Sequence, residues 1–136
     1  RIQELLYRQS GILGVSGRSA DLRDLIPDNR PATRLAIDMF CHRVARETAA
    51  LAVSLGGLDV IAFTGGIGEH RAEVREDVCR QLSFLGVAID AERNRAASGT
   101  PASAIHADGS AVEVWVVPTD EGRVAATEAA RLLSSM

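Results

Sequence analysis

The sequence contains no lysine, because all 15 basic residues among its 136 are arginines. A phosphate-binding loop of the form GxxxxGK[ST] and Schiff-base chemistry both need lysine, so both are excluded. No apolar run is long enough to span a membrane or to form a secretory leader. The two cysteines, Cys41 and Cys79, lack CxxC or Cys/His metal spacing. We therefore expect two buried thiols in a reducing compartment.

What is present points to an ordered protein. Hydrophobic residues make up 46% of the chain, and its length suits one domain with its own core. The formal net charge is −3 and no basic cluster occurs, which argues against nucleic acid as a partner. The chain opens on Arg1 instead of methionine, and residues 2–9 resemble the interior of a domain. We therefore expect residues 1–136 to be a fragment of a longer protein.

Hydrophobic periodicity predicts helices that alternate with strands, which is the α/β class. The expected helices cover residues 2–8, a short segment capped by Ser19, residues 31–55, a segment around 74–85, residues 91–97 and the C-terminal segment after Asp120. The last helix is expected to bury Val124, Ala125, Ala129, Leu132 and Met136. A glycine-serine loop is expected at residues 10–19. The expected strands are a fully buried one at 58–63, a short one at 87–90, and two around the Asp108-Gly109 turn.

The segment IAFTGGIGEH, residues 61–70, places a strand before three closely spaced glycines. Glycines let backbone N–H groups approach a phosphate, and the start of the following helix favours negative charge. A plain strand-to-helix turn explains the same residues. A dinucleotide-binding GxGxxG is a third interpretation, with Asp90 near the expected distance, but Arg71 stands where the third glycine is needed. The glycine turn alone leaves these interpretations open.

Three segments together resemble the acetate kinases. FTGGIGEHRAEVRE resembles the family's FT[AG]GIGE signature, SGILGVSGRSADLRDL its SGLLGxSGxSxDxRD segment, and VEVWVVPTDE its strand ending in PT[ND]EE. They occur in the family's order, and the resemblance covers essentially the whole chain. It implies an α/β, ribonuclease-H-like fold: the C-terminal nucleotide-binding part of an actin-like ATPase-type two-domain protein, with the N-terminal domain absent.

The resemblance also implies a nucleotide site for ATP or ADP. Its residues in this sequence would be Asp21, Leu22, Arg23, Gly66, Ile67, Gly68, Glu69 and His70. The glycine backbone, with a positive φ expected at Gly66, would face the phosphates, and Ile67 would pack near adenine. His70 stands where the family usually has asparagine. Without the resemblance, Asp21 would be interpreted as a helix-start acid and Arg23 as a solvated side chain.

A magnesium role for Glu121 is implied in the same way, since this residue matches the glutamate of the PT[ND]E motif. A carboxylate near a nucleotide suits a hard cation that keeps most of its waters, although Glu121 could instead complete a helix cap. Gly122 stands where the family often has a second glutamate. Arg71 and Arg75, on the helix after the glycines, are expected to face solvent or a partner.

The resulting prediction is the ATP-binding part of a cytoplasmic, Mg²⁺-dependent acetate kinase, which converts ATP and acetate to ADP and acetyl phosphate. No catalytic residue is assigned, because the acetate pocket would lie in the missing N-terminal part. The resemblance also implies a homodimer. A propionate kinase of the same family, and a non-catalytic nucleotide-binding or dimerisation module, are the alternatives.

Overall fold

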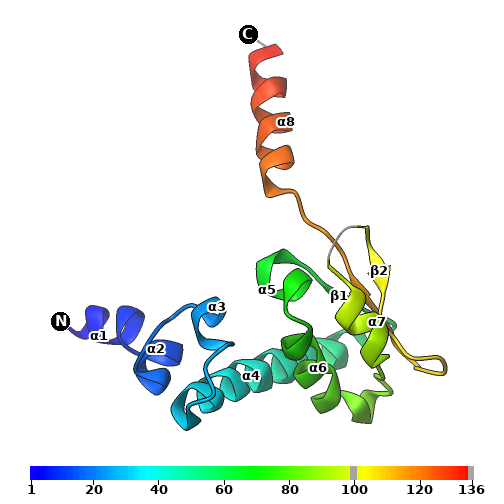
Figure 1. The fold of residues 1–136 in the computed structure, drawn as a ribbon. Helices are drawn as coiled ribbons and strands as arrows, with labels where there is room; N and C mark the ends of the chain where they lie inside the picture. The colour runs from blue at the N-terminus through cyan, green and yellow to red at the C-terminus, as the bar shows by residue number, and fades with distance from the viewer. Residues whose placement is uncertain (99–100, 135–136) are drawn as a thin grey trace.

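A computed structural model describes residues 1–98 and 101–134, except for the side chains of Glu121 and Val124. Within this part, most of the helices lie to one side of a small mixed sheet, and the last helix extends away from it (Figure 1). The helices are α1 (Ile2–Arg8), α2 (Gly11–Ser16), α3 (Leu22–Leu25), α4 (Pro31–Leu55), α5 (Gly65–His70), α6 (Ala72–Gln81), the 3-10 turn η1 (Ser83–Leu85), α7 (Ala91–Ala96) and α8 (Glu121–Ser134). The α/β class predicted from the sequence is confirmed.

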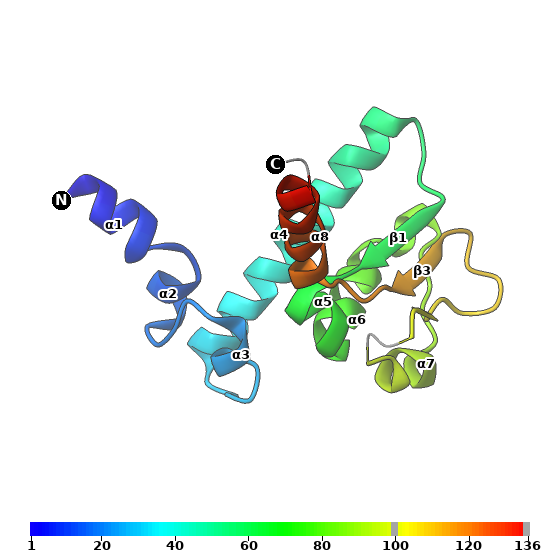
Figure 2. The ribbon, with the colours of Figure 1, turned by 90° about the horizontal axis from the view of Figure 1, so that it is seen from above.

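The sheet has the order β1-β3-β2 among the described residues. Strand β1 (Val60–Phe63) runs parallel to β3 (Glu113–Val116), and β2 (Ser103–Ala104) runs antiparallel to β3. Figure 2 shows β1 and β3 side by side. Residues 87–90 contribute only one isolated bridge, from Ile89 to His106. Parallel pairing of β1 and β3 places the segments that follow them at the same edge of the sheet.

The core lies where α4, α6 and the sheet meet. It includes Ile37 and Cys41 of α4 together with residues of α6 and β3, namely Val74, Val78, Cys79, Val114 and Val116. Burial raises the pKa of the Cys41 thiol to about 11 and that of Cys79 to about 12. Both cysteines are free and buried, as expected.

Helix α4 begins and ends as its sequence predicts. Pro31 occupies the first helical position, where its missing N–H costs no hydrogen bond. Gly56 ends the helix in the left-handed conformation with φ of 74°, and the Gly57 N–H donates to the Ala52 carbonyl at 3.0 Å. Leu51, near the end of the helix, is 63% exposed. One face of the C-terminal turns of α4 thus lies outside the core of this chain, although Ala52 in the same turns is buried.

Two local predictions near the N-terminus are wrong. Residues 10–19 contain helix α2 instead of a continuous loop, because Ile12 and Val15 pack against the core and this packing overrides weak helix propensity. Asp21, not Ser19, is the N-cap of α3, since its carboxylate accepts from the Arg23 N–H. Ser19 instead accepts from the Asp21 N–H and donates to Asp24.

Two predictions of burial are also wrong for this chain. Strand β1 alternates exposed and half-buried residues, because Ile61 and Phe63 pack against the core while Val60 and Ala62, on the opposite face of the strand, are exposed. Helix α8 projects away from the body (Figure 1), and Ala125, Ala129 and Leu132 are exposed. The Val124 side chain and Met136 lie outside the described residues. In the described ranges, no helix combines the length and hydrophobicity needed to cross a membrane.

Candidate functional site

The two motifs that follow β1 and β3 meet beyond the carboxyl ends of these strands. Phe63 pairs with Val116 in register, and the Val117 N–H donates to the Phe63 carbonyl at 2.8 Å. The glycine segment 64–70 then leaves β1, while residues 118–121 leave β3. Ligand sites in open α/β sheets form at this edge. The topology therefore brings together segments about fifty positions apart in the sequence.

The three glycines after β1 have three different environments. Gly65 has a φ of 70°, so it provides the left-handed residue at the strand-to-helix turn. Gly66 is exposed, and a Cβ added there would meet nothing within 4 Å. A Cβ on Gly68 would lie 3.2 Å from the Phe63 carbonyl carbon. The expectation of a positive φ at Gly66 is therefore wrong, and the residues expected as a loop form the first turn of α5.

Glu69 links the glycine turn to the segment after β3. Its Oε1 atom accepts hydrogen bonds from the Gly65 N–H at 2.9 Å, and from the Thr119 N–H and hydroxyl at 3.0 Å each. The residue is buried, with 8% of its surface exposed. The hydrogen bonds from Thr119, reinforced by that from Gly65, lower the pKa of the Glu69 carboxyl group. Glu69 therefore stays ionised at neutral pH and holds two chain segments together.

Arg75 supports α5 from its other end. Its guanidinium donates to the carbonyl oxygens of Gly68 and Glu69 at 2.8 Å each. It also donates to the side-chain and backbone oxygens of Asn94 and to the Ala97 carbonyl. The expectation that Arg75 faces solvent or a partner is wrong, because α6 directs it inward, where the carbonyls at the end of α5 need donors. Burial lowers the pKa of this guanidinium from its usual value.

The DxR segment forms a compact ion pair at the start of α3. The Asp21 carboxylate accepts from the Arg23 N–H at 2.8 Å and from Arg23 Nε at 3.0 Å. The hydrogen bond from the Arg23 side chain lowers the pKa of Asp21 to about 2, and the charge of Arg71 contributes to the same shift. Leu22 between them is buried. Asp21 is thus both the helix cap and a permanently ionised group at the surface.

A groove of about 420 Å³ joins this segment to the glycine turn. Its lining consists of Ile12, Ala20, Asp21, Leu22, Phe40 and Ile67. Three of the eight residues predicted to hold a nucleotide, Asp21, Leu22 and Ile67, therefore face one cavity. The other five, Arg23, Gly66, Gly68, Glu69 and His70, are not part of its wall, and His70 is exposed.

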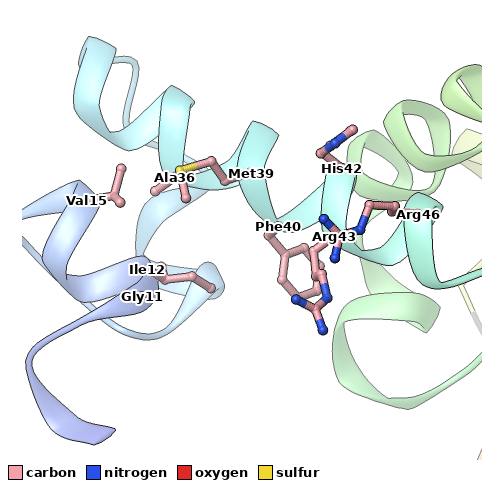
Figure 3. Close-up of a pocket in the computed structure, with 9 residues that line it drawn as sticks. All are labelled: Gly11, Ile12, Val15, Ala36, Met39, Phe40, His42, Arg43 and Arg46. Atoms are coloured by element: carbon pink, nitrogen blue, oxygen red, sulfur yellow. The ribbon is translucent and has the colours of Figure 1, made fainter. Parts of the chain in front are cut away.

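An adjoining groove of about 460 Å³ runs between α2 and α4. Figure 3 shows Ile12 and Val15 of α2 on one side and Met39 and Phe40 of α4 on the other. Ile12 and Phe40 line both grooves. Sequence reasoning missed these two residues, although the SGILG segment that contains Ile12 was itself one of the family motifs.

The acidic residues after β3 begin the last helix. The Asp120 carboxylate accepts from the Arg123 N–H at 2.8 Å, which confirms the predicted cap of α8. Glu121 is the first residue of α8, but its side chain lies outside the described part of the structure. Among the described residues, no group of three or more His, Cys, Asp or Glu side chains is arranged to hold a metal.

The α/β fold, with motif-bearing parallel strands and a groove beyond their ends, is part of an actin-like ATPase fold. A family model described as the acetokinase family matches residues 1–127, so the chain belongs to this family. Over 131 residues it is 49% identical to an acetate kinase of Rhodopseudomonas palustris. The alignment covers 96% of this chain and 32% of that protein.

Solved structures give the same result. The acetate kinase of Porphyromonas gingivalis superimposes with a TM-score of 0.83 and 39% identity, covering 97% of this chain and 34% of that one. A propionate kinase of Francisella tularensis has a TM-score of 0.77 and 33% identity, covering 88% and 30% of the two chains. The chain thus spans about a third of the length of the relatives that it matches.

Proposed function

We propose that this chain is the C-terminal, nucleotide-binding part of an acetate kinase and holds ATP or ADP in the groove between α3 and α5. The observation that carries the proposal is the meeting of Asp21, Leu22 and Ile67 around one cavity. These residues come from two motifs of the family that are separate in the sequence. An apolar groove with a few polar groups at its rim suits an adenosine group.

The residues around the groove would each contact a different part of the nucleotide. Ile67, beside the buried Leu22, offers apolar surface to the adenine ring, and the Asp21–Arg23 pair offers charged groups to the ribose side. The exposed backbone at Gly66 can approach the phosphates, because no side chain stands in the way. Exposed His70 can donate one hydrogen bond to the nucleotide where the family usually has asparagine.

Magnesium would be held by Glu121 together with the nucleotide phosphates and water. Mg²⁺ commonly binds through one or two carboxylates and keeps several waters, so a single glutamate beside the nucleotide phosphates would suit it. When bound, the ion neutralises charge on the phosphoryl group during transfer. The role of this chain is to hold the ion and the nucleotide in a fixed relation.

Acetate would be bound by the remainder of the enzyme. The chain spans only a third of its relatives, and phosphoryl transfer needs positive charge around the transferring group as well as bound acceptor. We therefore propose that residues 1–136 alone make no acetyl phosphate. The enzyme would act in the cytoplasm as a homodimer, with the exposed apolar end of α4 as part of the contact between subunits.

Propionate is the alternative acyl substrate, and the similarity to the Francisella tularensis propionate kinase supports this alternative. Both reactions use the same nucleotide chemistry. Rates of a full-length enzyme with acetate and with propionate at saturating ATP would choose between them.

A nucleotide titration of a full-length enzyme that contains this chain tests the site. Gly66→Val should reduce ATP affinity by about tenfold or more, since a branched side chain would cover the backbone at a position where an added Cβ meets no atom within 4 Å. Gly57→Val is the matched control, because Gly57 is equally open and lies outside the groove. Equal ATP affinity in the two folded variants would show that the glycine segment is only a turn and does not bind the nucleotide.

A further inference from the structure

We infer that Glu69 is a positioning residue. It fixes the start of α8, where Glu121 would hold Mg²⁺, relative to the glycine turn after β1, and it contacts neither the metal nor the nucleotide. This inference rests on the proposed function, since it assumes that Glu121 holds the ion. It adds a role for Glu69 that differs from direct contact with nucleotide. The residues that carry it are Glu69, Gly65 and Thr119.

The hydrogen bonds of Glu69 are directed at the protein. Three donors converge on its Oε1 atom, one from the start of α5 and two from Thr119. Charge-assisted hydrogen bonds of this kind are about twice as strong as neutral ones. With 8% of its surface exposed, the residue has little area left for a ligand. The carboxylate is therefore engaged in linking two segments.

Thr119 lies two residues before Glu121, so its position determines where α8 begins. The chain leaves β3 through Val117, whose N–H is held by the Phe63 carbonyl, and then reaches Thr119. Beyond that point, the Asp120 cap is local to α8, and the described side chains of the helix are exposed. The Glu69–Thr119 contact is therefore the last described tether of this segment to the body before Glu121.

The chemistry of the contact needs an anion. The Gly65 N–H, the Thr119 N–H and the Thr119 hydroxyl all donate to the same oxygen. In Glu69→Gln the amide oxygen is a weaker acceptor, and the amide nitrogen cannot accept from these donors. Thr119→Val removes the hydroxyl hydrogen bond and keeps the branched shape, whereas Thr119→Ser restores a hydroxyl.

The test measures the Mg²⁺ concentration that gives half-maximal rate in a full-length enzyme containing this chain, together with nucleotide affinity without metal. Glu69→Gln and Thr119→Val should each raise the Mg²⁺ requirement about tenfold. Thr119→Val should leave metal-free nucleotide affinity unchanged, and Thr119→Ser should restore the normal requirement. The double variant should resemble the more severe single variant, because both changes break the same contact.

The outcomes separate this inference from the proposed function. A merely structural role would lower kcat through loss of folded enzyme, without a change in the Mg²⁺ requirement. Glu121→Gln is the reference, and an unchanged requirement in that variant would refute the metal assignment itself. If Glu121→Gln raises the Mg²⁺ requirement while folded Thr119→Val does not, the positioning role of Glu69 is refuted and the metal assignment of Glu121 still holds. Should Glu69→Gln fail to fold, Thr119→Val still decides the question.

Discussion

Arg75 and Asn94 meet in the interior of the protein, where Arg75 Nε donates to Asn94 Oδ1 at 2.7 Å and the guanidinium also donates to the Asn94 carbonyl. Both residues are buried, and the hydrogen bonds described for the guanidinium all go to uncharged oxygens. Asn94 in turn donates to the Ala72 carbonyl at 2.9 Å. The pair thus connects α5, α6 and α7 through one polar cluster.

Loss of this cluster should destabilise the protein strongly. Arg75→Met should lower the free energy of unfolding by about 3 kcal/mol, because it leaves several buried carbonyls without donors. Arg80→Met is the matched control on the same helix, since Arg80 is exposed and forms an ion pair with Asp77 one turn earlier. It should change stability by about 0.5 kcal/mol or less. Urea unfolding followed by circular dichroism measures both, and similar values for the two would contradict the structural role of Arg75.

Gly66 and Gly68 should respond in opposite ways to alanine. Gly68→Ala should cost about 1 kcal/mol or more, because the new Cβ would press on the backbone of Phe63. Gly66→Ala should leave stability unchanged or raise it by up to about 1 kcal/mol, since its space is open and alanine is the better helix former. Thermal unfolding of the two variants checks the order. A destabilised Gly66→Ala variant would show that this glycine has a backbone role that the fold does not reveal.

The turn before α4 should lose stability in acid. Asp28 accepts from the Arg30 N–H at 3.0 Å, and its other oxygen accepts from Arg18, Arg30 and Thr33. The Arg30 backbone hydrogen bond is the main cause that holds the pKa of Asp28 well below its usual range. Because the folded pKa is lowered, this stabilisation is complete above about pH 4, the unfolded value, and is lost as the pH falls through the folded one.

Asp28→Asn tests that pH dependence. The variant should unfold at lower urea concentration than the parent chain at neutral pH, and the difference should shrink as the pH falls from about 4 to about 2. Asp108→Asn is the control, since the Asp108 side chain is 91% exposed and forms a surface ion pair with Arg93. A difference for Asp28→Asn that is independent of pH would mean that its charge does not stabilise the turn.

The exposed end of α4 should mediate self-association. Val53 is 83% exposed and Leu55 is 76% exposed, and the neighbouring strand residue Val60 is 51% exposed. Val53→Glu should raise the dissociation constant about tenfold, because it introduces a charge into an apolar contact. Ala91→Glu is the control, since it adds the same charge at an exposed position at the start of α7. Sedimentation at several concentrations measures both, and a monomeric parent chain at high micromolar concentration would contradict the proposed dimer contact.

The residues 1–136 alone should bind nucleotide weakly and make no acetyl phosphate. The groove on this chain is open on one side, and the acceptor site is proposed to lie elsewhere in the enzyme. A hydroxamate assay for acetyl phosphate, with a full-length family member as positive control, measures this directly. Turnover by the isolated chain would place the chemistry within these residues.

Local patterns predicted the features that depend on local chemistry. Pro31 and Gly56 mark the ends of α4, Asp120 caps α8, and Gly109 turns the chain between β2 and β3 with a φ of 87°. Each of these depends on the backbone preference or hydrogen bonding of one residue. Hydrophobic periodicity predicted the α/β class, and the resemblance of three segments to the acetate kinases implied the family and the proximity of the glycine and DxR segments.

Features that depend on tertiary packing could not be predicted from the sequence. Helix α2 exists because Ile12 and Val15 pack on the core, although its glycines and serines favour a loop. Arg75 is buried because of carbonyls that only the folded α5 and α7 present to it, and an arginine in an amphipathic helix ordinarily faces water. Burial of β1 was overestimated because an apolar run does not reveal whether both faces of a strand are covered in the fold.

The parallel pairing of β1 and β3 has a consequence for how the protein can vary in length. The chain leaves β1 after Phe63 and enters β3 at Glu113, so the excursion between these two strands, which includes β2, begins and ends at fixed positions. An inserted residue in a surface turn such as Asp108-Gly109 would alter the excursion without moving either strand. An insertion between Val116 and Thr119 would shift the latter by roughly 3 Å, which is more than a hydrogen bond tolerates. We therefore expect related sequences to differ in length within the excursion and to keep a constant spacing in the two short segments that leave the strands.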